Sequence, residues 1–111
     1  MISVQTIGSI TVLKPRSALV GECLTLCRQA IKDSLHRHRT HLIVDLTECP
    51  LVASAGLEML LDSQTECLRL GGKLVISEPQ DLCNEIFDIT GVSESVGVFK
   101  DMRSALSDFA R

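Results

Sequence analysis

The stretch that decides the fold runs from residue 44 to residue 57 and reads Val44-Asp45-Leu46-Thr47-Glu48-Cys49-Pro50-Leu51-Val52-Ala53-Ser54-Ala55-Gly56-Leu57. Its start ends a short apolar run typical of a buried strand, and its last four residues form a small-residue turn that opens a helix. The hydroxyl of Ser54 is therefore expected at a helix N-terminus, where unpaired backbone N–H groups and the helix dipole stabilise negative charge. Without a base that hydroxyl is a poor nucleophile, but it is well placed to carry a phosphate.

Hydrophobic periodicity on both sides of this stretch predicts alternating strands and helices. The expected strands are residues 2–7, 9–14, 41–46, 73–76 and 96–99. The expected helices are residues 19–36, 54–68, 79–90 and 102–109, with Gly71-Gly72 and Gly91 as helix stops. The order β-β-α-β-α-β-α-β-α predicts a single α/β domain over residues 1–111. Its sheet should be mixed and mostly parallel, with about five strands and about four helices.

Composition excludes several classes of function. The net charge is -3, no long basic run occurs, and the aromatic residues are three phenylalanines, which argues against nucleic-acid binding. No apolar run approaches the roughly 18 residues of a membrane span, and the N-terminus lacks the features of a secretory signal. The sequence therefore predicts a cytoplasmic protein, most simply a bacterial one, with no membrane partner.

The cysteines and histidines are the residues that could serve as metal or redox groups. The five cysteines fit neither a metal site nor a disulfide framework, and Cys23 and Cys27 share an apolar helix face with Leu19, Val20, Leu24, Ala30 and Ile31. Buried, reduced thiols are the favoured interpretation, with a metal or redox role as the alternative. The basic cluster of residues 36–41, which contains three histidines and two arginines, favours a solvated turn that compensates a helix dipole over a metal site. No metal and no cofactor are expected.

An ordered set of short motifs resembles a known family. The motifs are Leu42-Ile43-Val44-Asp45-Leu46, Ser54-Ala55-Gly56-Leu57, residues 71–76, residues 89–92 and the closing helix. Together they resemble the STAS domain of bacterial anti-sigma factor antagonists. The resemblance implies a protein-binding switch and not an enzyme. In such a switch the unphosphorylated protein binds an anti-sigma factor and so frees the sigma factor. The anti-sigma factor, which is also a serine kinase, phosphorylates the serine at the position of Ser54, and a separate phosphatase resets it.

Two positions depart from the family pattern. The acidic residue that precedes the phosphorylated serine is Ala53 here, and the acidic turn after the second strand is replaced by residues 14–19, which contain no acid. Both changes remove negative charge beside Ser54, so a phosphate there would meet less repulsion. The missing acids can also serve to position the serine or to contact the kinase. Constitutive partner binding is therefore an alternative to phosphorylation.

The residues expected to bind the partner are Ala53, Ser54, Ala55, Gly56, Glu58 and Asp62. Each has a structural alternative. Ser54 can simply cap its helix, Gly56 can allow close packing, and Asp45 can bond a neighbouring turn. Glu48, Glu58, Asp62 and Glu66 make an acidic run around this helix, and the last three are spaced by four residues. The run forms either a solvated face or a docking surface for a basic patch.

Two further function classes compete with the switch. One is a constitutive STAS scaffold, or a subunit of a larger signalling or transport assembly, in which Ser54 is only structural. The other is a thiol enzyme, which is disfavoured because no nucleophile elbow, P-loop or metal-ligand set occurs and because thiolates are disfavoured on apolar faces. The sequence does not define the oligomeric state.

Overall fold

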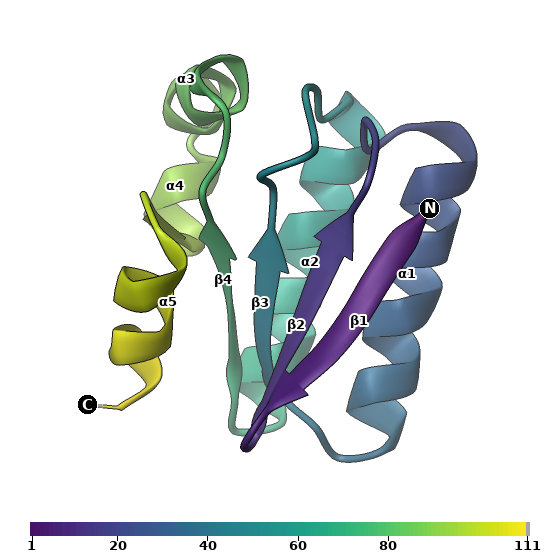
Figure 1. Cartoon of the computed structure of the whole chain (residues 1–111), viewed down its shortest axis with the longest axis vertical. Coiled ribbons are helices and arrows are strands. Elements are labelled where there is room, and N and C mark those ends of the chain that lie inside the picture. The colour runs from purple at the N-terminus through teal and green to yellow at the C-terminus, as the bar shows by residue number, and fades with distance from the viewer. Residues whose placement is uncertain (111) are drawn as a thin grey trace.

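The computed structural model describes residues 1–110 and contains one mixed sheet with helices on both faces (Figure 1). The strands lie in the order β1-β2-β3-β4-β5 and are β1 (Ile2–Ile7), β2 (Ile10–Pro15), β3 (His41–Asp45), β4 (Lys73–Ser77) and β5 (Gly97–Phe99). The helices are α1 (Gly21–His36), α2 (Ser54–Arg69), α3 (Asp81–Thr90), α4 (Val92–Ser95) and α5 (Met102–Phe109). The predicted fold class, a mixed sheet of five strands in an α/β domain, is confirmed.

The sheet combines one hairpin with three parallel pairs. β1 and β2 are antiparallel and close at the pair Ile7 and Ile10, where Gly8 takes a positive φ of 61°. All neighbouring pairs from β2 to β5 are parallel, so each strand after β2 is reached by a helical crossover. Parallel strands end at the same edge, and the loops that follow β2, β3 and β4 therefore meet at one edge of the sheet.

Successive side chains of each strand point to opposite faces of the sheet, and this divides the core into two layers. On one face, Leu42 and Val44 of β3 pack in a cluster with buried residues of α1, α2, α3 and α4, and all of these helices lie on that side. On the other face, Ile43 of β3 and Val75 of β4 pack against Ala105 of α5. Because α5 is short, it covers only part of its face. Both middle strands are thus buried on both sides, as parallel strands require.

Several predicted boundaries were wrong for local reasons. α1 begins at Gly21 and not at Leu19, because Leu19 forms an isolated parallel bridge with Val52, and Val20 is consequently exposed. α3 begins at Asp81, two residues after the expected Pro79. The strand predicted to stop before Pro15 includes it, and the single turn α4 was not expected. A four-residue helix is too short to produce a periodic signal.

The cysteines are buried as predicted, and the basic cluster of residues 36–41 is exposed in part. All five thiols are free and buried, and burial raises the pKa of Cys27 to about 12. The basic segment follows the expectation at His36, Arg37 and His38, which are exposed, with His36 in the last turn of α1, whereas Arg39 and His41 are half-buried. Arg39 donates from Nε to the Thr11 hydroxyl at 3.1 Å, and His41 packs edge-on against Phe109 with ring centroids 5.5 Å apart. These contacts are long-range in sequence, so local composition could not predict them.

Candidate functional site

The loops at the carboxyl edge of the sheet are tied together by backbone hydrogen bonds. Leu19, in the loop after β2, donates its N–H to the carbonyl oxygen of Leu51 at 2.8 Å. Its own carbonyl accepts from the N–H of Ala53 at 3.4 Å. The segment that leads into α2 is therefore held on both sides of Val52, which sets where the helix begins.

Ser54 is the first residue of α2 and is exposed at its N-terminus. The residue in the N-cap position is Ala53, with φ -75° and ψ 170°, and no side chain caps the helix. The prediction that Ser54 caps the helix is therefore wrong: its hydroxyl sits one residue too late to reach back over the first turn. Within residues 1–110, no hydrogen bond occupies that hydroxyl. The result is an unengaged hydroxyl beside an uncapped, electropositive helix end.

Gly56 is where α2 makes its tightest approach to the tied loops. A Cβ at this position would lie 2.8 Å from Cγ1 of Val52 and 3.2 Å from the carbonyl oxygen of Leu19. The close-packing interpretation of Gly56 is confirmed, although the neighbour is the bridged loop and not a strand. Because Gly56 is buried, it contributes to the site by letting the start of α2 lie close to Leu19.

The loop segments beside Ser54 expose apolar side chains, and no acid lies in the first turn of its helix. Val20 and Leu51, on the two bridged segments, are 41% and 40% exposed. The first turn of α2 contains no acidic residue. Of the other residues predicted for partner binding, Ala55 is exposed and Ala53 is half-buried. Ser54 thus opens its helix beside loop segments that expose two apolar side chains, and the exposed Glu58 follows one helical turn later.

The acidic residues of α2 are exposed beyond its first turn. Glu58 and Asp62 are solvent-accessible and make no ion pair within the described part of the chain. Glu66, the third acid of this series, is paired with Arg69 at 2.9 Å on its own helix. The predicted acidic face therefore exists, with its first two carboxylates unengaged.

A charged cluster that sequence reasoning missed lies on the loop before α2. Glu48 accepts ion pairs from Lys14 at 3.1 Å and from Arg16 at 2.8 Å. Hydrogen bonds from both cations hold the pKa of Glu48 below its ordinary value. The basic turn that departs from the family pattern thus finds its counter-charge on the next loop. The available signal was two cations at the end of β2 and an acid in the loop after the neighbouring strand β3.

Asp45 organises the loop between β3 and α2. It is buried and accepts from the N–H of Thr47 at 3.0 Å and also contacts the Thr47 hydroxyl, which confirms the expected turn contact. The same hydroxyl lies 2.8 Å from Oε2 of Glu78, and Gln80 donates to the Thr47 carbonyl at 3.1 Å. Glu78 and Gln80, which sequence analysis did not select, therefore join the third loop to the site.

Metal and thiol chemistry receive no support from the geometry. Within residues 1–110, no three His, Cys, Asp or Glu side chains are grouped so that they could hold a metal ion. Burial raises the pKa of Cys49 and of Cys67 to about 11, which disfavours the nucleophilic thiolate. None of the helices within residues 1–110 is both long enough and apolar enough to span a bilayer.

Comparisons with known proteins identify a family from the sequence and a shared fold from solved structures. A sequence model of the STAS domain matches residues 1–105. A solved structure of a putative anti-sigma factor antagonist from Thermotoga maritima is similar, with a TM-score of 0.92, 15% identity, and coverage of 99% of this chain and 95% of that one. The anti-sigma factor antagonist SpoIIAA in its unphosphorylated form gives a TM-score of 0.84, 13% identity, and coverage of 99% and 96%.

A structure of SpoIIAA from Bacillus in the phosphorylated form is also similar. The likeness extends to a transporter: the murine anion transporter Slc26a9 gives a TM-score of 0.69 and 18% identity, covering 92% of this chain but only 18% of the transporter. At these identities the structural matches establish the fold alone.

Proposed function

Because this chain belongs to the STAS domain family, we propose that it is a bacterial anti-sigma factor antagonist that binds an anti-sigma factor through the surface around Ser54 and releases it when Ser54 is phosphorylated. Similarity in fold to anti-sigma factor antagonists supports the general class. The observation that carries the proposal is the exposed Ser54 hydroxyl, which opens α2 and makes no hydrogen bond to the described residues 1–110. A protein of this class acts in the cytoplasm as a regulator of transcription.

The unphosphorylated surface is suited to docking a protein. The exposed side chains of Val20 and Leu51 offer apolar area near the start of α2, and burying apolar area favours association. Glu58 and Asp62 lie farther along α2 and would face a basic patch on the anti-sigma factor. This combination of apolar area and charged residues is typical of protein interfaces.

Phosphorylation at Ser54 would act through charge. A phosphate adds about -1.5 to -2 charges at neutral pH, and these must be desolvated when an apolar partner surface closes over them. The uncapped end of α2 favours the phosphate in either state, but the water that solvates the phosphate is lost only in the complex. The phosphorylated protein is thus stable, while its complex is weakened. Transfer from ATP by the anti-sigma factor kinase, and hydrolysis by a serine phosphatase, would set the two states.

The departures from the family pattern are compatible with this mechanism. Ala53 places no carboxylate next to the serine, and Lys14 and Arg16 replace an acidic turn. The field at Ser54 is therefore less negative than in the family pattern. A kinase for this protein would have to recognise the serine without the usual neighbouring acid.

The decisive experiment combines binding with mass measurement. The protein is incubated with ATP and the anti-sigma factor kinase encoded nearest to it, and intact mass is recorded together with the affinity for that kinase. One phosphate should be added to the wild type and none to Ser54→Ala. Ser54→Asp should weaken binding at least tenfold, whereas Ser107→Asp, at an exposed serine on α5, should not.

The second candidate is constitutive binding as a scaffold or as a subunit of a signalling or transport assembly. The absence of an acid at Ala53 and the similarity to an anion transporter favour it. Equal binding by wild type, Ser54→Ala and Ser54→Asp, with no phosphate added, would support this candidate and refute the switch.

A further inference from the structure

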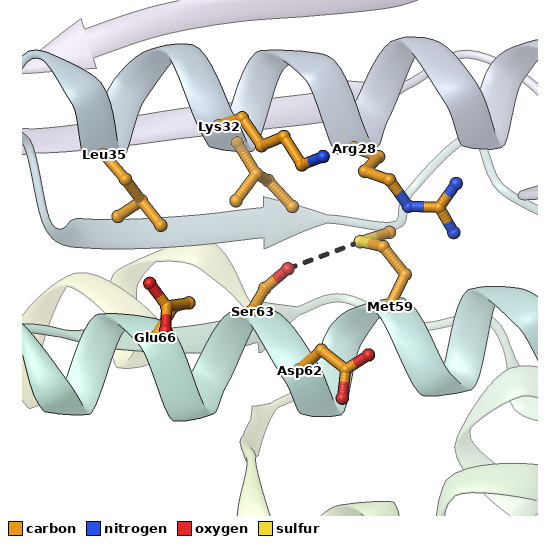
Figure 2. Close-up of a pocket in the computed structure, with 8 residues that line it drawn as sticks. Arg28, Lys32, Leu35, Met59, Asp62, Ser63 and Glu66 are labelled. Carbon is orange, nitrogen blue, oxygen red and sulfur yellow. Dashed lines mark hydrogen bonds between the residues drawn. The ribbon is translucent and has the colours of Figure 1, made fainter.

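α1 and α2 leave a groove between them on the outer surface of the helix layer. Its volume is about 260 Å³, and Figure 2 shows it bounded by α1 on one side and α2 on the other. Ile31, Leu35 and Met59 supply apolar lining. Ile31 and Met59 are buried and Leu35 is half-buried, so this lining is continuous with the core.

Charges of opposite sign line the two rims of this groove. Arg28 and Lys32 stand on the α1 rim, and Asp62 and Glu66 stand on the α2 rim (Figure 2). Among the described residues, Arg28, Lys32 and Asp62 form no ion pair, and only Glu66 is engaged, by Arg69. The groove therefore presents a basic rim and an acidic rim that do not neutralise each other.

We propose that this groove is a dimer interface that binds a second copy of the same chain. Both helices connect parallel strands, so they run in the same direction. A two-fold axis parallel to the two helices places α1 of one copy opposite α2 of the other. Each residue stays at the same height along the groove. Arg28 and Asp62 lie toward the same end of the groove in Figure 2, so Arg28 of each copy faces Asp62 of the other. The contact occurs twice, as in any isologous interface.

Charge complementarity favours a second copy over another occupant. A partner of one sign would be repelled by one of the two rims, whereas the two-fold arrangement pairs each rim with its opposite over an apolar centre. Each helix has 16 residues and is therefore about 24 Å long. Two helices about 10 Å apart present a footprint of roughly 500 Å² per copy, below the ~800 Å² per partner of a standard interface. The dimer is therefore weak and sensitive to salt.

The dimer interface does not include the phosphorylation site, but it shares Asp62 with the surface proposed above to bind the anti-sigma factor. Asp62 lies two helical turns beyond Ser54, and the second rim belongs to α1. The inference does not depend on the function proposed above, because it concerns purified protein with no kinase present.

Sedimentation equilibrium of the full chain, from micromolar to near-millimolar concentration and at low and high salt, tests the proposal. The wild type should dimerise, and high salt should weaken the dimer. Arg28→Glu and Asp62→Arg should each weaken it at least tenfold, since each reversal affects both copies of the contact. An equimolar mixture of the two variants should dimerise again, because every contact in the mixed dimer then joins opposite charges.

Arg103→Glu is the matched control, since Arg103 is an exposed cation on α5, on the other face of the sheet. It should dimerise as the wild type does, and thermal unfolding should establish that every variant is folded. A wild type that stays monomeric at the highest concentration would overturn the proposal. So would a dimer that ignores both reversals, or a mixture that remains monomeric.

Discussion

Replacing Gly56 by alanine should destabilise the protein, although alanine is the better helix former. The added methyl would lie 2.8 Å from Cγ1 of Val52, which is 3% exposed, and 3.2 Å from the carbonyl oxygen of Leu19. Neither neighbour is free to move, because Val52 is buried and the Leu19 carbonyl is bonded to the N–H of Ala53. The start of α2 would have to shift.

The size of the effect follows from two opposed contributions. Overpacking a tight site costs about 1–3 kcal/mol. The gain from replacing a helical glycine with alanine is at most about 1 kcal/mol. The expected net loss is therefore about 1–2 kcal/mol in the free energy of unfolding. For a domain of this size that corresponds to a decrease in Tm of roughly 4–12 °C.

Urea unfolding followed by far-UV circular dichroism measures this loss, and the chain has no Trp or Tyr that would serve as a fluorescence probe. Val52→Ala removes the methyl that clashes, so Gly56→Ala should cost at least ~1 kcal/mol less in that background. Ala55→Gly, at the adjacent exposed position, should show no such coupling. If Gly56→Ala costs the same in both backgrounds, or stabilises the wild type, the packing argument is refuted.

Three other predictions concern buried polar and titrating groups. Gln64→Leu should lower the free energy of unfolding, as measured by chemical denaturation, by about 2–4 kcal/mol. The Gln64 side chain accepts from the N–H of Leu74 at 2.7 Å and donates to the Ser95 carbonyl at 3.0 Å, and both bonds would be lost. Stability should fall as pH rises from 9 to about 12, because folded Cys27 keeps the proton that the unfolded chain releases, and Cys27→Ala should reduce that slope in urea titrations. An NMR titration should find the pKa of Glu48 below 4.5, so its stabilising contribution is lost as pH falls through that folded pKa.

The sequence predicted the order of elements and the sheet, because those features are encoded in local periodicity. The helix stops at Gly71 and Gly91 were predictable for the same reason, and both residues adopt positive φ. The start of α1 was not, because the extended conformation of Leu19 depends on pairing with Val52, 33 positions away. A window of local sequence contains no information about such a partner.

The candidate site was predicted in position but not in detail. The small residues around Ser54 located a helix start correctly, but they could not say that Ala53 would take the capping position. The ion pairs of Glu48 and the contact of Glu78 with Thr47 join loops from separate strands. They follow from the parallel topology and become visible only once the strand ends are placed side by side.

The strands occupy the sheet in the same order as they occur along the chain. During synthesis each new strand can therefore add to an edge that already exists, without inserting between strands made earlier. Such sequential growth keeps loop closure short and favours rapid folding from the N-terminus as the chain leaves the ribosome. Only α5, which packs on the opposite face, must wait for the sheet to be completed. Truncation before α5 should therefore trap a late, sheet-containing intermediate with one apolar face open.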